Sequence, residues 1–408
     1  MLDRERGRTI PPRNGQSGRT SAAAEKKNLQ QLNLVRMKKI VLLAVAMTVS
    51  LSVLTASGQS SFLPKHLAVL RAGNGALRLH LKQSPVFIDE FAPDSFNNAP
   101  LLTIAIPTNG PDAIFFNGHA ATEGMMCRSS DGRFLTFAGY GGLNLLQESG
   151  TPSLLDIGRA FCTVDAAGHT HTIIYEQYGG TEKMNPRGGV TDGANHFWSC
   201  GNASGTAYYD AGGSGGPVIF AAVPDSRQVK IISGTLYTTL NGPDGVFLGV
   251  PSGIFSFVDG SGDPEPLPDS PKTKLSLAVQ ADKDYSKIAG FDMNPEGTIA
   301  YTADAEKGVQ KYVKADGDWK FAYNFSIPQN IPTAANHENG CFALTADFTG
   351  SAPVIYATTT EGYNGCVNSN RVVRIVDTGA SAQVTTIAQA TSAEIVFRGI
   401  SFTPEAKP

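Results

Sequence analysis

The sequence predicts an all-β fold built from repeated four-stranded antiparallel sheets, and three observations support this prediction. A glycine-centred turn followed by a short apolar strand with an aromatic residue recurs five times. The sequence beyond the first 58 residues shows no convincing 3.6-residue apolar period, which an amphipathic helix would need. Three strand-like segments near the N-terminus and one at the C-terminus add up to one further sheet. Repeated sheets that cannot bury both faces alone pack around an axis, so we predict a six-bladed β-propeller.

The recurring unit is identified by its turn. It reads Ser130-Asp131-Gly132-Arg133-Phe134-Leu135 in one copy and Asn294-Pro295-Glu296-Gly297-Thr298-Ile299-Ala300-Tyr301 in another. The five turn glycines are Gly132, Gly193, Gly234, Gly297 and Gly350. Their intervals are mostly longer than the roughly 40 to 50 residues of a propeller blade with modest loops. The spacing therefore indicates one blade per interval, with room for extended connections.

The segments after each turn have the composition of strands, rich in Val, Ile, Tyr, Phe and Thr and bounded by Gly, Asp, Asn and Pro. The predicted strands are 133–140, 159–164 and 171–177; 196–200, 205–209 and 217–222; 229–232, 235–239 and 245–250; 288–294, 298–303, 308–314 and 319–325; 341–347, 354–359, 371–377 and 383–388. The segment from Gly260 to Lys274 contains four prolines, and we predict an exposed loop between blades there.

The two ends of the propeller are expected to share one blade. Strands at 66–72, 85–91 and 101–107 lack a fourth partner, and Phe397 to Phe402 forms a lone strand at the C-terminus. Pairing of the C-terminal strand with the N-terminal blade closes the ring and removes its free sheet edges. Seven blades are the alternative, if the stretch from Gly141 to Arg187 holds an extra unit.

Composition and charge exclude some classes of protein. The chain has 408 residues, of which 41% are hydrophobic and 17% charged, so it can bury a large core. Its formal net charge of −3 gives no basic field for neutralising phosphates, and we therefore expect no nucleic-acid partner.

The N-terminal region divides into two parts. Residues 1–36 are polar and read as a disordered leader or a mis-called start, with Met37 as the alternative initiator. Residues 37–58 have the positive, apolar and small-residue regions of a signal peptide, and its apolar run is short for a bilayer span. We therefore expect residues 59–408 to form a single propeller domain, secreted, periplasmic or on the cell surface, without a permanent membrane anchor.

Because the chain is expected to be exported, and thiols outside the cytosol tend to pair, we expect disulfides among its cysteines. Cys341 and Cys366 lie within one predicted blade and are the predicted disulfide. The pairing of Cys127, Cys162 and Cys200 stays open, with at most one bridge among them. Their spacing does not match a metal site, and the sequence indicates no metal and no cofactor.

Several stretches resemble a family of exported bacterial β-propeller proteins, six- or seven-bladed, with no assigned activity. They are Ala68 to Gly73, Val86 to Phe91, Thr191 to Trp198 with the following Gly205 to Tyr209, Arg227 to Tyr237, Gly308 to Tyr312 leading to Trp319, and Phe397 to Pro404. The likeness covers roughly His66 to Pro404. Because these motifs are turn and strand-packing signatures, the resemblance implies the propeller fold and no catalytic residue.

Ser214 lies in a glycine-rich run, Gly212 to Pro217, that resembles the nucleophile turn of trypsin-like proteases. The Asp that usually precedes such a serine is Gly213 here, and His119 lacks the expected context for the base. We therefore interpret the run as a connection between the third and fourth strands of a blade, where glycine permits positive φ.

Other polar residues are expected to have structural roles. His169 and His171 could share one face of a strand, but no third metal ligand is evident, so solvated imidazoles on an edge strand are expected. The acidic pairs Asp282 with Asp284 and Asp316 with Asp318 do not form a calcium-binding loop pattern and are expected to form turns.

The channel mouth is the remaining candidate site, because inner strands of all blades converge there. Six polar residues near the ends of predicted inner strands are the candidates: Arg128, Asp131, Asp192, Asp292, Asp347 and Arg398. An Asp beside Gly in a tight turn more often stabilises its own backbone, so this assignment is a hypothesis.

The sequence favours a monomeric, non-catalytic binding or scaffold protein whose extracellular ligand is a carbohydrate, a cell-surface component or a protein. The alternative is an extracellular hydrolase, lactonase-like at the central channel or serine-dependent at Ser214. A purely structural envelope or adhesion role is a further alternative. An enzyme would show three or more carboxylates or imidazoles at one channel mouth, or Ser214 within hydrogen-bond reach of a His. A binding protein would show a mouth lined by aromatic and amide side chains.

Overall fold

The computed structural model describes residues 60–406, except 77–78, 80–82, 97–98, 119, 121, 142–156, 177–184, 203–204, 221–224, 242–245, 248, 286, 329–339, 362–369 and 393. Backbone contacts divide the chain into Met1–Gly58 and Gln59–Pro408. Only the second unit is described below. The predicted leader and signal peptide lie outside the described residues.

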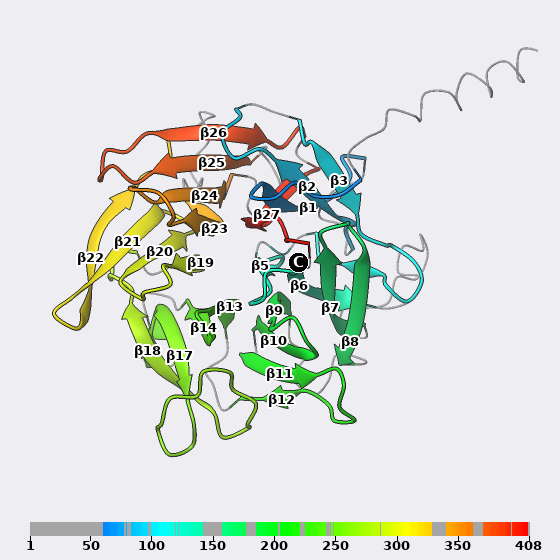
Figure 1. Ribbon diagram of the computed structural model, residues 1–408, viewed down its shortest axis with the longest axis horizontal. Helices are drawn as coiled ribbons and strands as arrows, with labels where there is room; N and C mark the ends of the chain where they lie inside the picture. The colour runs from blue at the N-terminus through cyan, green and yellow to red at the C-terminus, as the bar shows by residue number, and fades with distance from the viewer. Residues whose placement is uncertain are drawn as a thin grey trace, which may run out of the picture. The chain divides into compact units, whose positions relative to one another are not determined.

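The described residues form six antiparallel sheets that are arranged around a central axis, as Figure 1 shows. Within the described part of the chain every regular element is a strand. The predicted six-bladed β-propeller is thus confirmed, and the seven-bladed alternative is wrong. The stretch from Gly141 to Arg187 that could have held an extra blade contributes β7 and β8 to the second blade instead.

The blades follow chain order. Blade 1 consists of β27 (Val396–Phe402), β1 (Leu67–Ala72), β2 (Val86–Phe91) and β3 (Leu102–Ala105); blade 2 of β4 (Ile114–Phe115), β5 (Met126–Arg128), β6 (Phe134–Gly141), β7 (Gly158–Asp165) and β8 (Thr170–Glu176); blade 3 of β9 (Pro186–Thr191), β10 (His196–Gly201), β11 (Thr206–Asp210) and β12 (Val218–Ile219). Blade 4 consists of β13 (Ser226–Ile232), β14 (Thr235–Leu240), β17 (Gly253–Val258) and β18 (Lys274–Gln280); blade 5 of β19 (Ile288–Met293), β20 (Ile299–Asp304), β21 (Gly308–Ala315) and β22 (Asp318–Phe325); blade 6 of β23 (Cys341–Asp347), β24 (Val354–Thr359), β25 (Arg371–Val376) and β26 (Val384–Gln389).

The ring closes in blade 1, as predicted from the two ends of the chain. The C-terminal strand β27 pairs antiparallel with β1, with Phe402 opposite Leu67 and Phe397 opposite Arg71. The register shifts between these pairs, which places a β-bulge in β27 around Arg398 and Gly399. Because β27 is also the innermost strand, the chain end is held at the axis of the ring (Figure 1).

The inner strands β27, β5, β9, β13, β19 and β23 each contact the inner strands of both neighbouring blades. This close approach requires small residues. Gly399 donates its N–H to the carbonyl of Gly124 at 2.7 Å, and a side chain at Gly399 would overlap the backbone of Met126. A Cβ at Gly290 would likewise lie 2.8 Å from the Cα of Ala343.

Blade 4 differs from the sequence prediction. The segment predicted as its third strand contributes instead to a small hairpin of β15 (Val246–Phe247) and β16 (Val250–Pro251), and the third strand is β17. The Pro-rich segment from Gly260 to Lys274 connects β17 to β18 within the blade, so the prediction of an inter-blade loop was wrong. Its carbonyls anchor it, since Pro268 accepts from the indole of Trp198 and Pro266 from the N–H of Leu236.

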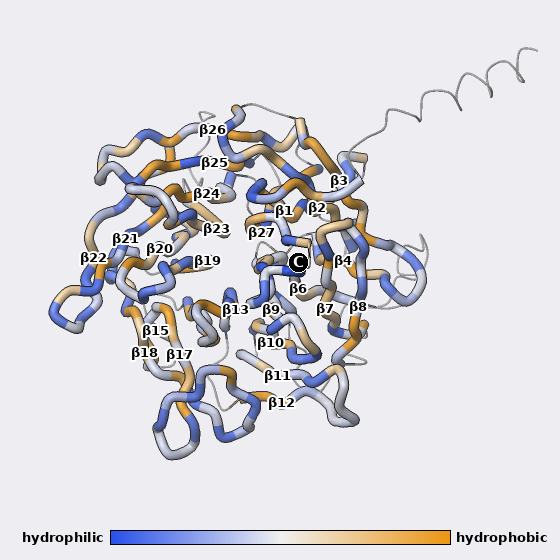
Figure 2. The backbone as a smooth tube through the Cα atoms, in the orientation of Figure 1, coloured by the Kyte–Doolittle hydropathy of each residue, from blue (hydrophilic) through white to orange (hydrophobic). Residues whose placement is uncertain are grey.

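The core lies between the sheets. Apolar side chains of adjacent blades pack together, as in the cluster that joins Trp198 of β10 to Val229 of β13. Figure 2 shows apolar residues along the strands and many hydrophilic residues in the connections at the rim of the ring. Burial of this apolar surface is the main favourable contribution to folding.

Polar contacts also join blades 5 and 6. Asp377 accepts hydrogen bonds from the hydroxyls of Tyr301 and Tyr323 and from Lys311, the last at 2.6 Å. Burial alone would raise the pKa of the Asp377 carboxyl, but these hydrogen bonds, led by that from Lys311, hold the net pKa below its usual value.

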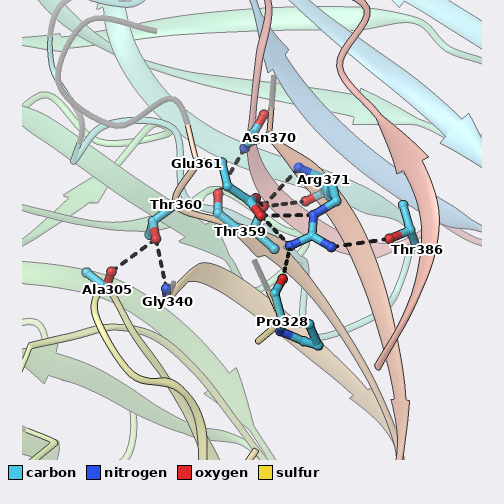
Figure 3. Close-up of polar contacts among 9 residues, drawn as sticks. All are labelled: Ala305, Pro328, Gly340, Thr359, Thr360, Glu361, Asn370, Arg371 and Thr386. Atoms are coloured by element: carbon cyan, nitrogen blue, oxygen red, sulfur yellow. Dashed lines mark hydrogen bonds and ion pairs between the residues drawn. The ribbon is translucent and has the colours of Figure 1, made fainter. Parts of the chain in front are cut away.

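A second tie lies at the other end of the same two blades (Figure 3). The guanidinium of Arg371 pairs with Glu361 and donates to the carbonyl of Pro328 at 2.7 Å. The hydroxyl of Thr360 donates to the carbonyl of Ala305 at 3.0 Å. Arg371 and Glu361 are both largely buried, so loss of either partner would leave an uncompensated charge.

The described cysteines Cys127, Cys162, Cys200 and Cys341 are buried and not bonded to one another. Cys366 lies outside the described residues, so the predicted bridge to Cys341 stays a prediction. Burial raises the pKa of the Cys127 thiol to about 11, which keeps it protonated and unreactive at neutral pH. No helix among the described residues has the length and apolar character for crossing a membrane.

The close approach at Gly399 predicts a stability effect. We expect Gly399→Ala to lower the free energy of unfolding by about 1–3 kcal/mol, because the added methyl must displace the backbone of blade 2. Chemical denaturation would measure this. Gly216→Ala is the matched control, since a Cβ there meets no atom within 4 Å. Equal unfolding midpoints for the two variants would contradict the prediction.

Candidate functional site

The two ends of the propeller differ in which connections they carry. One end, here called the turn face, carries the turns that join the inner strand to the second strand in blades 2 to 6. Those turns include Gly132, Gly193, Gly234 and Gly297, all with positive φ as tight turns require. The other end carries the connections from one blade to the next.

The turn face holds a pocket of about 550 Å³, here called the turn-face pocket. Blades 1, 2, 5 and 6 contribute to it. Its lining residues are Lys65, Pro93, Arg128, Pro295, Ala346, Asp347, Phe348, Thr349, Tyr356, Phe402 and Glu405. This volume is in the range of small-molecule and cofactor sites.

Aromatic side chains form a wall of the pocket. Tyr356 of β24 and Phe402 of β27 meet edge to face, with ring centroids 5.8 Å apart. Phe348 stacks on Tyr301 of blade 5 at 5.9 Å. Each ring is held by an aromatic neighbour, so the wall is formed before a ligand arrives.

The polar residues of the pocket carry both signs of charge. Arg128 donates to Glu405 of the C-terminal tail at 3.0 Å, and both side chains are partly exposed. The tail is fixed by a hydrogen bond from the N–H of Glu405 to the carbonyl of Gly132 at 2.9 Å. Asp347 caps its own turn by accepting from the N–H and the hydroxyl of Thr349, and Lys65 is exposed.

Asp292 lies directly behind the pocket. Its Oδ2 accepts from the ammonium of Lys230 at 2.6 Å and from the N–H of Ala346 at 3.0 Å. It thereby links blades 4, 5 and 6 beneath the lining residue Ala346. The role that this geometry gives to Asp292 is to position the blade 6 turn.

The structure thus brings two of the six predicted channel-mouth residues, Arg128 and Asp347, into one pocket, with Asp292 behind it. Asp131 pairs with Arg133, and Asp192 pairs with His196 at 2.6 Å; neither lines the pocket.

The sixth residue, Arg398, is 5% exposed. It lies over the ring of Phe342 and beside Gly124, in the bulge of β27. Arg398 is therefore buried in the interior and does not line the pocket.

The other sequence candidates fall into structural roles. Ser214 is exposed in the connection between β11 and β12, the third and fourth strands of blade 3, as expected. His169 and His171 are largely exposed at the start of β8 and lie near Asp165 and Asp112. His119 and the proposed disulfide partner Cys366 lie outside the described residues. The described residues contain no group of three or more His, Cys, Asp or Glu that could hold a metal ion.

Sequence reasoning missed the aromatic residues of the pocket. Phe348 and Phe402 lie at or just beyond the ends of inner strands, where an apolar residue reads as core. Phe348 directly follows the candidate Asp347, and Phe402 lies in the same predicted strand as the candidate Arg398; these positions are the signal that could have identified them. Lys65 and Glu405 were missed because they lie outside the repeated units.

A buried polar cluster of blades 2 and 3 surrounds Glu123, which is 1% exposed. Its carboxylate accepts from the hydroxyl of Tyr140 and from the N–H of Asn117, each at 2.8 Å. Burial raises the pKa of Glu123 to about 7, against the opposing effects of these hydrogen bonds and of Arg398 and Arg159. Burial raises the pKa of Asp304 as well, to about 6, so Glu123 is the described carboxyl whose pKa lies closest to neutrality.

The proteins similar to this chain are found among solved structures. No family model matches the chain. No curated protein sequence matches it either. Among solved structures, the chain is similar to one in the crystal structure of a nidogen/laminin complex, with 10% identity over 83% of this chain and 98% of that chain, at a TM-score of 0.48.

Two further solved structures are similar. A putative 6-phosphogluconolactonase from Bacteroides fragilis shares 12% identity over 80% of this chain and 82% of its own, at a TM-score of 0.42. The WD40 repeats of RRP9 share 10% identity over 81% of this chain and 86% of theirs, at a TM-score of 0.39.

The pKa of Glu123 predicts how stability depends on pH. The folded-state pKa of about 7 exceeds the ordinary value of 4.5, so the unfolded state releases its proton first as pH rises. The contribution of Glu123 to the free energy of unfolding is therefore lost as the pH rises from 4.5 to 7. Above pH 7 the folded protein holds a buried charge. We expect Glu123→Gln to stabilise the protein by about 2 kcal/mol more at pH 8 than at pH 5.

Denaturation of both proteins at the two pH values would measure this difference. Asp316→Asn is the control, because its side chain is 95% exposed. A Glu123→Gln effect that is the same at pH 5 and pH 8 would contradict the raised pKa.

Proposed function

We propose that this chain is an exported, monomeric and non-catalytic binding protein that holds a neutral carbohydrate in the turn-face pocket. The signal-peptide pattern at residues 37–58 supports export. The observation that carries the proposal is the combination of preformed aromatic walls with polar groups of both signs in one pocket on a rigid ring.

The charges of the pocket favour a neutral ligand with many hydroxyl groups. Asp347 and Glu405 balance Lys65 and Arg128, so a ligand of either net charge would meet repulsion as well as attraction. A hydroxyl group can donate to a carboxylate and accept from a guanidinium or an ammonium. The pocket can therefore satisfy hydroxyls on several sides of a sugar ring.

The apolar surface of the pocket fits the same ligand. The C–H face of a pyranose ring is apolar, and aromatic or proline surfaces can cover it. Phe348, Phe402 and Pro93 provide such surfaces beside the charged groups. A few fixed polar groups among mainly apolar walls are typical of small-molecule sites, where they set orientation and specificity.

The polar groups of the pocket are used in ways that suit binding. Asp347 is committed to its turn and Arg128 to Glu405. A general base needs a proton to abstract within hydrogen-bond reach and a pKa near the working pH. Among described residues, the carboxyl with a pKa of about 7 is Glu123, which does not line this pocket.

The proposal predicts that the isolated propeller binds neutral oligosaccharides. We expect Arg128→Ala and Phe348→Ala each to weaken binding about tenfold, since each removes one hydrogen-bonding or stacking partner worth about 1.4 kcal/mol. Isothermal titration calorimetry with cello-, malto-, xylo- and chito-oligosaccharides would measure the affinities. Lys320→Ala is the control, because this exposed residue does not line the pocket.

Three results would overturn the proposal. They are the absence of binding to every one of these oligosaccharides, affinities that the Arg128 and Phe348 substitutions leave unchanged, and cleavage of the bound sugar. Chromatography of the sugar after incubation would detect cleavage, which would favour the hydrolase instead. Preferential binding of peptides would favour a protein partner.

A further inference from the structure

A second pocket of about 490 Å³ lies on the turn face between blades 4 and 5. Trp319 of β22 and Tyr237 of β14 contribute aromatic surface to it, and both are partly exposed. Glu296, Lys314 and Asp318 contribute charged groups of both signs. Like the turn-face pocket, this pocket combines aromatic side chains with charged groups of both signs, but its surface is more polar and its residues come from different blades.

The two pockets are adjacent because one turn lines both. Pro295 lines the turn-face pocket, whereas the next two residues, Glu296 and Gly297, line the second pocket. Adjacent Cα atoms are about 3.8 Å apart. The blade 5 turn is therefore the partition that separates two sites on the same face of the ring.

Hydrogen bonds hold this partition in place. The Asn294 carboxamide accepts from the N–H groups of Thr298 and Ile299 at 2.8 and 2.7 Å, and it donates to Glu296 at 2.9 Å. Ser233 of blade 4 donates its hydroxyl to the carbonyl of Pro295 at 2.9 Å. A partition fixed from both sides keeps the spacing between the pockets constant, which reduces the ordering cost of a ligand that spans them.

We propose that the two pockets are subsites for one linear, neutral oligosaccharide that crosses the blade 5 turn. This inference rests on the proposed carbohydrate-binding function and adds that the ligand is recognised along its length. A single sugar unit or a disaccharide fills one pocket. A longer chain fills both, and contacts in the second pocket then add to affinity without a second loss of translational freedom.

The experiment compares chain lengths. Titration calorimetry would use cello-, malto-, xylo- and chito-oligosaccharides of two and six units. For the sugar whose hexamer binds best, we expect the hexamer to bind at least tenfold more tightly than the dimer. The double substitution Glu296→Gln with Asp318→Asn is expected to weaken hexamer binding about tenfold and to leave dimer binding unchanged. These polar substitutions preserve size, and Asp318 is exposed, so the fold is retained.

The control substitution is Asp316→Asn, which lies in the same turn as Asp318 but lines neither pocket. Trp319→Ala provides a second test, with the unfolding temperature as a check on its fold. Equal affinities for dimer and hexamer, or a hexamer affinity that the double substitution does not change, would overturn the two-subsite inference. If Arg128→Ala still weakens both lengths in that case, the proposed function stands. If no oligosaccharide binds at any length, the proposed function itself fails.

Discussion

The contact between β27 and β5 is the constraint on which the rest of the structure depends. The bulge at Gly399 brings the backbone of the C-terminal strand against that of blade 2, with a direct hydrogen bond to Gly124. Only a residue without a Cβ permits this approach. The same strand pairs with β1 within blade 1 and contacts β23 of blade 6, so the ring is closed and every inner strand has a neighbour on both sides. The five turns that follow the inner strands of blades 2 to 6, and the C-terminal tail that follows β27, are thereby brought to one end of the axis.

Closure also explains why the candidate site is assembled from distant parts of the sequence. Lys65 precedes the first strand, Glu405 follows the last, and Arg128 lies on β5, yet all three line one pocket. The pairing of Arg128 with Glu405 fixes the C-terminal tail over the turn of blade 2. On the opposite sides of blades 5 and 6, the contacts of Asp377 and Arg371 hold the two sheets together. A pocket between blades needs such ties, since its lining comes from separate sheets.

Much of the fold could be predicted from the sequence because the glycine turns and the strand compositions are local signals. Blade 4 was less predictable, since Val246 to Val250 has the composition of one strand. It forms instead most of a small hairpin in which two residues of each strand are paired. The site was partly predictable. Asp347 ends an inner strand, and convergence of such ends is a property of the fold. Arg398 could not be placed, because its direction depends on a β-bulge that composition does not reveal.

Buried charges and half-exposed charges have different roles in this protein. On the turn face, charged side chains lie beside exposed aromatic and proline surfaces and are only partly buried, so they can exchange water for ligand at little cost. Arg371 and Glu361 lie instead largely buried, where their opposite charges are paired with each other. A ligand gains no binding energy from a charged group that is already paired inside the protein. The chain thus uses buried charge to fix the blades and half-exposed charge, beside aromatic rings, to form its surface for recognition.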